Sequence, residues 1–375
     1  MHAYTVFLIA FIEAFGWTRA QSSIPYAVSQ MITGATSPVV GMLVDRLGPR
    51  RMVVIGGVLL SIGLLASASV NALWQVILLY GVVMTLGANC LGLVVFVPVL
   101  SRRFVRHRGT AVAVVQSANG LARAYSAPLT QLLIADLGWR GAYLVQGGFM
   151  AAVSLPLAML FSGTDVKRVA SVAVRAHEQG WTLSRAMRTP HFWLLSLVYV
   201  FTGLGSFLVA LHQLAFAITI GFDRLYAAGV LGMGAFLSLP GVILTGWMSD
   251  RVGREVSAVV TYGTSIFGVV CAMLIHSPSQ HLLLWLHACF FGLTWGARGP
   301  AITAKTADLF PGPQLGTILG AITIGTGIGS AAGSWLAGFS FDLTGSYRVA
   351  FALSIFFYAC GSVAFWLLRR PPARW

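Results

Sequence analysis

Long apolar runs alternate with short polar connections along almost the whole chain. An α-helix needs about 20 apolar residues to cross the hydrocarbon core of a bilayer, which is roughly 30 Å thick. Most of the runs reach that length. Division of the chain at its charge clusters and turn residues therefore predicts twelve membrane-spanning helices, near residues 2–14, 23–44, 52–70, 75–100, 109–135, 140–162, 191–219, 225–248, 256–276, 282–304, 314–337 and 347–368.

One connection is much longer than the others. Residues 163–190 are polar, and they separate the first six predicted helices from the last six. We therefore expect an N-terminal six-helix half over residues 1–162, a cytoplasmic linker over residues 163–190 and a C-terminal six-helix half over residues 191–375.

The two halves also repeat short stretches of sequence. GMLVDRLGPR at 41–50 recurs as GWMSDRVGRE at 246–255, an offset of 205 residues, and Asp136-Leu137 recurs as Asp342-Leu343 at an offset of 206. These matches indicate an internal duplication. Parallel repeats around a site at the middle of the membrane are a transporter architecture, in which access alternates as one half rocks against the other. The expected fold is an all-α polytopic membrane protein with two six-helix pseudo-repeats around a central cavity.

Composition and charge narrow the functional class. Hydrophobic residues make up 57% of the chain and charged residues only 9%, which leaves no room for a soluble catalytic domain. The net charge of +14 is spread between apolar runs, so we expect no nucleic-acid partner. Of the 24 Lys and Arg residues, 18 fall in loops on one side, which predicts that this side and both termini are cytoplasmic. The expected location is the inner membrane of a bacterium.

The residues that carry enzymatic or metal chemistry do not form a recognisable pattern. The four cysteines lie inside apolar runs, and neither a nucleophile with a base nor a metal-ligand spacing is found in the sequence. We therefore expect no disulfide framework, no metal, no cofactor and no enzymatic activity.

Arg123 lies near the middle of the fifth predicted span, where a charge is costly unless it faces a wet cavity or a partner. Its spacing from Gln116 and Asn119, and from Ser126 and Thr130, places all five residues close to one helical face. Such a face suits a cavity wall, so we expect Arg123, Asn119 and Gln116 to bind substrate. The alternative is that Arg123 only locks helices together.

Arg298 lies within the tenth predicted span, and its guanidinium can hold a carboxylate with two parallel N–H groups. Spacings of 7, 4 and 7 residues place His287, Thr294, Arg298 and Lys305 on one face, which indicates a cavity wall or an exit path. The Gly-Pro pair after Arg298 favours an alternative, in which the helix bends and Arg298 satisfies the freed carbonyl groups.

Further polar residues of the spans are weaker candidates. Asn89, Tyr199 and His212 are candidate substrate contacts, although each can instead bond one helix to another. An imidazole titrates near neutral pH, so His212 and His287 are candidates for proton transfer. Glu13 is the one acid near the interior of a predicted span.

Glycines of the eleventh predicted span form a second kind of pattern. Gly325, Gly329 and Gly333 make a double GxxxG, which lets a neighbouring backbone approach closely. The pattern predicts a tight contact between helices, not a binding site.

Several motifs carry a family resemblance. The loop after the second predicted span has the pattern GxLxDRxGxR, with Gly41, Asp45, Arg46, Gly48 and Arg50, and it resembles the major facilitator superfamily. Further motifs narrow the resemblance to the monocarboxylate-porter-like branch, the relatives of lactate, pyruvate and oxalate/formate carriers. These motifs are FGWTRA at 15–20, RRFVRHRGTAVAV at 102–114, GWRGAY at 138–143, LSRAMRTPHFWLL at 183–195, His212 and GARGP at 296–300. The resemblance covers nearly the whole chain and implies twelve helices and secondary transport of small organic anions.

The charged residues of the resembling loop are candidates for gating. Asp45, Arg46 and Arg50 lie in its first copy, and Asp250 and Arg251 lie in its second. Charges at these positions can bridge the cytoplasmic helix ends in one conformation and release them in the other.

Two departures limit what the resemblance implies. In that branch a cationic residue of the eighth helix commonly anchors the substrate carboxylate, but residues 238–244 carry no charge here, so no relative's substrate can be carried over. FGWTRA normally follows a full first helix, and only 14 residues precede it, so we expect the first helix to be shortened.

The sequence therefore predicts a secondary active or facilitative transporter of a small organic anion, with a monocarboxylate as the first expectation and Arg123 and Arg298 as counter-charges. One alternative is an exporter of a neutral or amphipathic compound. Another is a transporter-like sensor that signals through residues 163–190. The expected partners are the anion, the lipid bilayer, and either protons or a counter-anion. Symport or antiport, the direction of transport and the oligomeric state stay open.

Overall fold

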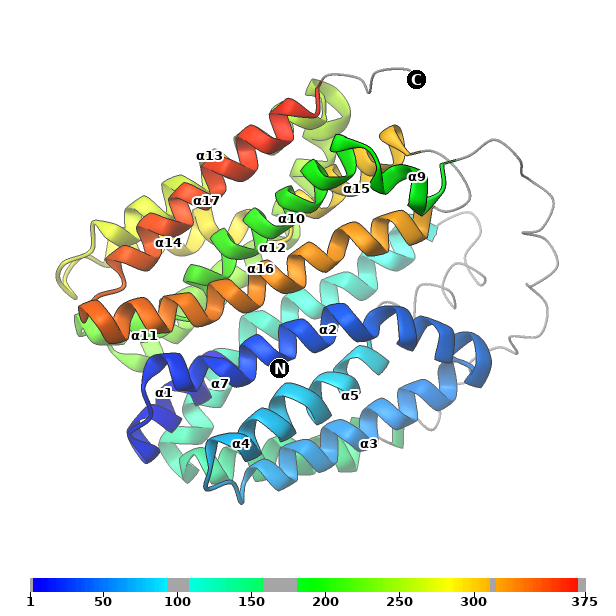
Figure 1. Cartoon of the computed structure of the whole chain (residues 1–375). Helices are drawn as coiled ribbons and strands as arrows, with labels where there is room; N and C mark the ends of the chain where they lie inside the picture. Colours follow the sequence, from blue (N-terminus) through cyan, green and yellow to red (C-terminus); the bar gives the residue numbers. More distant parts are fainter. Residues whose placement is uncertain (1–2, 93–107, 155, 158–180, 311–314, 370–375) are drawn as a thin grey trace.

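The computed structural model describes residues 3–92, 108–154, 156–157, 181–310 and 315–369, and this part of the chain is a bundle of long helices without strands (Figure 1). The first group of helices comprises α1 (Tyr4–Phe15), α2 (Arg19–Leu47), α3 (Pro49–Ser67), α4 (Leu73–Val76), the π-helical η1 (Ile77–Met84), α5 (Thr85–Cys90), α7 (Arg108–Phe149) and the π-helical η2 (Met150–Ser154). The second comprises α9 (Leu183–Met187), α10 (Pro190–Ala210), α11 (Gln213–Ile220), α12 (Arg224–Val252), α13 (Arg254–Met273), α14 (His281–Leu293), α15 (Arg298–Leu309), α16 (Leu315–Thr344) and α17 (Arg348–Leu367).

Each of the twelve predicted spans contains a described helix. Within the described residues, six helical stretches suit a membrane crossing by length and composition alone: Pro49–Ser67, Leu73–Cys90, Pro190–Ile220, Arg224–Ser249, Arg254–Met273 and Arg348–Leu367. The helix α1 has 12 residues and packs through the rings of Phe7 and Phe11 on Tyr143, with the Phe7 and Tyr143 ring centroids 3.9 Å apart.

Repeated turns separate the helices. Gly16 and Gly221 both have positive φ, at 66° and 108°, and Gly48 and Gly253 have φ of 82° and 95° with ψ of 155° at both. Positive φ favours glycine because a Cβ atom would clash with the backbone. Both pairs are separated by 205 residues, which is the offset of the repeated sequence motif. The backbone therefore repeats where the sequence does.

Two predicted spans contain breaks. The helix α7 covers the fifth and sixth spans and is interrupted at Gly138, which has φ of 70° and ψ of 170°. The tenth span is divided into α14 and α15 by a turn at Gly296, where φ is 76°. The sequence predicted a bend at the Gly-Pro pair that follows Arg298, and the break lies just before Arg298 instead.

Two helix pairs make most of the contact between the two groups of helices. In Figure 1 the helices from α1 to η2 lie together on one side and those from α9 to α17 on the other, and the packing of α2 on α16 and of α7 on α12 joins them. The predicted linker lies mostly outside the described residues, and its last part forms α9. The boundaries of the two halves therefore stay a prediction.

Glycines hold α16 close to α10, as the double GxxxG pattern predicted. A Cβ atom added at Gly329 would lie 2.2 Å from the carbonyl oxygen of Val200, and one at Gly333 would lie 2.9 Å from that of Leu204. These distances are shorter than van der Waals contact, so only glycine fits this seam. The seam fixes the position of α10, which lines the cavity described next.

Candidate functional site

A cavity of about 270 Å³ lies where the two groups of helices meet. Four of its lining residues are alanines, which leave space that larger side chains would fill. A fifth, Gly232, lets α7 approach closely, because a Cβ atom there would lie 2.4 Å from the carbonyl oxygen of Ala124. Its wall comes from α1, α2, α7, α10, α11, α12 and the turn before α15, through Thr5, Tyr26, Gln30, Ala127, Phe207, Ala210, Leu211, Gln213, Leu214, Ala228, Leu231, Gly232, Ala235 and Trp295. A cavity at such a junction is where a transporter built from two repeats binds its substrate.

Three aromatic rings form a continuous part of the wall. The ring centroids of Tyr26 and Phe207 are 5.8 Å apart, and those of Phe207 and Trp295 are 5.4 Å apart at an interplanar angle of 65°. Each ring comes from a different element: α2, α10 and the turn between α14 and α15. The cavity therefore has an aromatic side.

Two amide side chains supply polar groups to the same cavity. Within the described part of the chain, neither Gln30 of α2 nor Gln213 of α11 has a hydrogen-bond partner for its side chain. Polar groups inside proteins are normally hydrogen-bonded, so these amides are available to a bound molecule. None of the described lining residues is charged.

The helix face that was predicted to bind substrate lies on α7. Position 123 is one helical turn before Ala127, which lines the cavity, and positions 119 and 116 continue the same face. The side chains of Arg123, Asn119 and Gln116 lie outside the described part of the structure. Their expected role as substrate contacts therefore rests on the position of the helix face.

Arg298 lies elsewhere, inside the second group of helices. It is 4% exposed, its guanidinium donates a hydrogen bond to Ser265 of α13, and its Cζ atom lies 4.6 Å from the ring centroid of Tyr262 and 4.5 Å from that of Tyr358. Among the described residues, Arg298 has no ion pair and its Nε–H has no partner. These described contacts are to a hydroxyl and two aromatic rings, not to the freed carbonyl groups that the alternative for this arginine supposed.

The face that Arg298 shares with three other residues packs against α13. His287 Nδ1 lies 2.8 Å from the carbonyl oxygen of Gly268, and the hydroxyls of Thr294 and Ser265 are 2.6 Å apart. Lys305 continues the contact with Glu255, at 2.6 Å. The predicted common face is present, but it forms a seam with a neighbouring helix and does not line the cavity.

The remaining predicted substrate contacts also bond helix to helix. Asn89 Nδ2 donates to Thr36 Oγ1 at 2.8 Å, which joins α5 to α2. Tyr199 of α10 is buried, and its hydroxyl lies near Thr303 of α15. Neither side chain is part of the cavity wall.

His212 is fully buried between the two groups of helices. Its Nε2 atom lies 3.1 Å from Ser23 Oγ of α2 and 3.0 Å from the carbonyl oxygen of Ser334 of α16, and its Nδ1 atom lies 3.4 Å from the hydroxyl of Tyr347. Its chain neighbours Leu211 and Gln213 line the cavity, whereas His212 does not.

The predicted gating residues are described only in part. The side chains of Asp45, Arg46 and Asp250 lie outside the described residues. Arg50 is exposed in the first turn of α3, and Arg251 is exposed with its Cζ atom 4.5 Å from the ring centroid of Trp247. Their role in gating stays a prediction.

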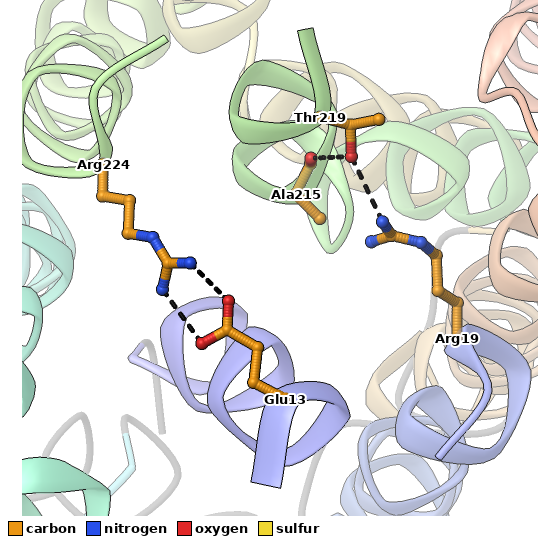
Figure 2. Close-up of polar contacts among 5 residues, drawn as sticks. All are labelled: Glu13, Arg19, Ala215, Thr219 and Arg224. Atoms are coloured by element: carbon orange, nitrogen blue, oxygen red, sulfur yellow. Dashed lines mark hydrogen bonds and ion pairs between the residues drawn. The ribbon is translucent and has the colours of Figure 1, made fainter. Parts of the chain in front are cut away.

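Polar contacts that join the two groups cluster at the predicted external end (Figure 2). We call this cluster the outer latch, and it consists of Glu13, Arg19, Thr219, Arg224, Asp342 and Tyr347. Glu13 of α1 forms a bidentate ion pair with Arg224 of α12. The Arg19 guanidinium donates to Tyr347 at 2.8 Å and to Thr219 at 3.1 Å.

Asp342 completes the outer latch from α16. Its two carboxylate oxygens accept hydrogen bonds from the backbone N–H groups of Arg19 at 3.0 Å and Ala20 at 2.8 Å, at the first turn of α2. A carboxylate is stabilised at a helix N-terminus because the free N–H groups and the helix dipole favour negative charge there. The latch thus binds α1 and α2 to α11, α12, α16 and α17.

Sequence reasoning missed part of the cavity wall. Thr5, Phe207, Gln213 and Trp295 lie within apolar runs, where spacing gives no sign of which face meets a cavity. The one available signal was Gln213, an amide next to His212 in an otherwise apolar stretch.

The long apolar helices and the cavity between their two groups define a multi-pass integral membrane protein of the transporter class. Residues 1–311 match the Major Facilitator Superfamily, and the chain belongs to this family. It is a transporter and not an enzyme, as the sequence predicted.

Relatives and a solved structure agree with this assignment. The chain is 27% identical over 367 residues to monocarboxylate transporter 13 of Bos taurus, with 96% of this chain and 83% of the relative covered. It is 24% identical over 379 residues to the uncharacterized MFS-type transporter YcxA of Bacillus subtilis, with 96% and 89% covered. A crystal structure of a variant of the nucleoside transporter NupG has a TM-score of 0.79 at 11% identity, with 98% and 96% covered, and it shows the shared fold.

Proposed function

We propose that this transporter carries a small organic anion, with monocarboxylates as the first class to test, and that it works by alternating access around the cavity. The names of relatives support this substrate class, since monocarboxylate transporters 13 and 12 match 96% of the chain. Two helix pairs, α2 with α16 and α7 with α12, join the moving parts that alternating access requires.

The position of Arg123 on α7 is the observation that carries the proposal. The face that includes residue 123 contributes Ala127 to the cavity wall, and Arg123 is the one cationic residue among positions 116, 119, 123 and 127. A guanidinium can hold a carboxylate with two parallel hydrogen bonds. Arg298 was expected to be a second counter-charge, but its described contacts lie on α13 and α17, so the proposal depends chiefly on Arg123.

Uptake of radiolabelled pyruvate and lactate into proteoliposomes tests the role of Arg123. We expect Arg123→Ala to abolish uptake, and we expect Arg123→Lys to restore little of it because a point charge cannot make a two-pronged contact. Arg348→Ala is the matched control, because Arg348 is an exposed residue of α17 away from the cavity. Normal carboxylate uptake by Arg123→Ala would remove the counter-charge from the proposal.

A second candidate is the transport of a neutral or amphipathic compound. The observation that favours it is the absence of charge among the described residues that line the cavity. The same assay separates the two candidates, since uptake of a neutral compound that persists in Arg123→Gln supports the second and contradicts the first.

Membrane orientation and coupling belong to the same proposal. We place both termini in the cytoplasm because 18 of the 24 Lys and Arg residues fall in loops on that side. A bacterial cell membrane is the proposed location, and a bacterial protein is among the matched relatives. Protons or a counter-anion drive the cycle if it is coupled.

A further inference from the structure

The chemistry of the cavity wall carries an inference about the shape of the substrate, and this inference rests on the proposed function. Aromatic rings of Tyr26, Phe207 and Trp295 meet there from three different elements. Aromatic groups attract one another in offset or edge-to-face arrangements, an interaction that saturated groups of the same size do not make. A wall of this kind favours a ligand with a flat unsaturated ring.

Space for such a ring lies along α7 and α12. The parts of the wall that these helices contribute include Ala127, Ala228 and Ala235, whose side chains are single methyl groups. A cavity of roughly 150 Å³ is enough to hold benzene, so about 270 Å³ accepts a single ring together with a polar group. A three-carbon acid leaves most of this space and most of the aromatic surface without contacts.

Polar groups suited to the head of the ligand lie in the same wall. Gln30 and Gln213 present side-chain amides, and within the described part of the chain these amides have no other partner. Each amide has N–H donors for a carboxylate or keto oxygen, and a carbonyl oxygen that accepts a hydrogen bond from a hydroxyl group. Arg123, one turn from Ala127, supplies the charge in the proposed function.

We propose that the substrate is an aromatic carboxylate: a single planar ring joined by a short chain to the acid group. The ring contacts Phe207 and its aromatic neighbours, and the acid group is bound by the amides and Arg123. In this proposal the ring makes the substrate bind more tightly than a three-carbon acid that carries the same acid group.

Direct binding to the purified full-length protein in detergent, measured by calorimetry, tests this proposal with three matched acids. Pyruvate supplies the acid group alone, phenylpyruvate adds a planar ring, and cyclohexylpyruvate adds a saturated ring of similar size. We expect phenylpyruvate to bind roughly tenfold more tightly than cyclohexylpyruvate and still more tightly than pyruvate.

Two variants test whether the aromatic wall is the cause. In Phe207→Leu and in Trp295→Leu the preference for the phenyl ring over the cyclohexyl ring should disappear, and a cooperative thermal unfolding transition in detergent reports that each variant is folded. Phe149→Leu is the matched control, because Phe149 is 63% exposed at the end of α7 and should keep the full preference.

The outcomes separate this inference from the proposed function. Equal binding of phenylpyruvate and cyclohexylpyruvate, or of phenylpyruvate and pyruvate, overturns the aromatic substrate and leaves carboxylate transport intact. Tight binding of neutral phenylacetamide that persists in Arg123→Gln overturns the proposed anion and supports the ring. Preference for the phenyl ring that survives both leucine variants overturns the role of the aromatic wall.

Discussion

At the scale of single residues, the guanidinium of Arg298 lies over the rings of both Tyr262 and Tyr358. Attraction between a cation and an aromatic face is worth about 2 kcal/mol or more when the pair is removed from water. The hydrogen bond to Ser265 adds to this stabilisation. Together these contacts allow a charge to be buried without a carboxylate beside it.

We therefore predict that Arg298→Ala lowers the free energy of unfolding, and that this loss of stability is its main effect. Loss of both ring contacts and creation of a void should cost about 2–4 kcal/mol, seen as a lower midpoint of thermal unfolding in detergent. Arg298→Met retains most of the side-chain volume and should lose less. An unchanged midpoint together with lost transport would return Arg298 to the substrate site.

Sequence spacing correctly predicted which residues share a helix face, but it did not predict which neighbouring helix that face contacts. The common face of His287, Thr294, Arg298 and Lys305 followed from helical periodicity, because that periodicity is a property of the backbone. Periodicity does not say which neighbour a face meets, and the neighbour is α13. The aromatic residues Phe207 and Trp295 gave still less information, since a ring in an apolar helix suits lipid, protein or a cavity equally.

At the scale of elements, the seam between α16 and α10 depends on glycine. A methyl group at Gly329 would lie 2.2 Å from the carbonyl oxygen of Val200, so the two helices would have to move apart. We predict that Gly329→Ala lowers the stability of the detergent-solubilised protein by about 1–3 kcal/mol, measured by thermal unfolding.

A second glycine of the same helix provides the matched control. At Gly320, no described atom of a neighbouring helix lies within 4 Å of the position that a Cβ atom would take. Alanine stabilises a helix relative to glycine by roughly 1 kcal/mol, so Gly320→Ala should raise or preserve the unfolding midpoint. Equal losses at the two positions would show that the seam is not the cause.

Some turns between helices were predicted correctly from the sequence, whereas the break in the tenth span was predicted at the wrong glycine. The turns at Gly48 and Gly253 followed from the repeated motif, because glycine is required where φ is positive. The break in the tenth span was expected at the Gly-Pro pair but occurs at Gly296, next to Trp295. Several glycines compete in that stretch, and tertiary packing decides which one takes the positive φ.

At the scale of the whole molecule, the fold followed from hydropathy, loop charge and the internal repeat, because each of these reflects the bilayer or the backbone. The way the two groups of helices are joined at the predicted external end did not follow from the sequence. The contact of Asp342 with the first turn of α2 joins residues more than 300 positions apart, and no local pattern encodes such a pairing.

We predict that Asp342→Asn favours opening of the predicted external end. The substitution removes one charged acceptor for a backbone N–H, a loss of about 1 kcal/mol or more, which corresponds to a change of roughly fivefold in the conformational equilibrium. The measurement is the labelling rate of a cysteine at Ala228, in a background without the four native cysteines, by an impermeant maleimide added outside. Faster labelling is expected.

The duplicated aspartate provides the control for this experiment. Asp136 is the sequence counterpart of Asp342, it is exposed, and within the described residues it has no hydrogen-bond partner. Asp136→Asn should leave the labelling rate unchanged. Equal rates in the wild type and Asp342→Asn would show that this carboxylate does not hold the two groups together.

In the proposed alternating-access cycle, the ion pair of the outer latch is expected to make closure of the predicted external end sensitive to dissolved salt. The side chains of Arg224 and Glu13 are 44% and 50% exposed, so mobile ions reach both charges. The screening length falls from about 8 Å at 0.15 M salt to about 3 Å at 1 M, and a pair of this kind contributes at most about 1 kcal/mol before screening. A dilute medium is therefore expected to keep the predicted external end closed for a larger fraction of time than a concentrated one.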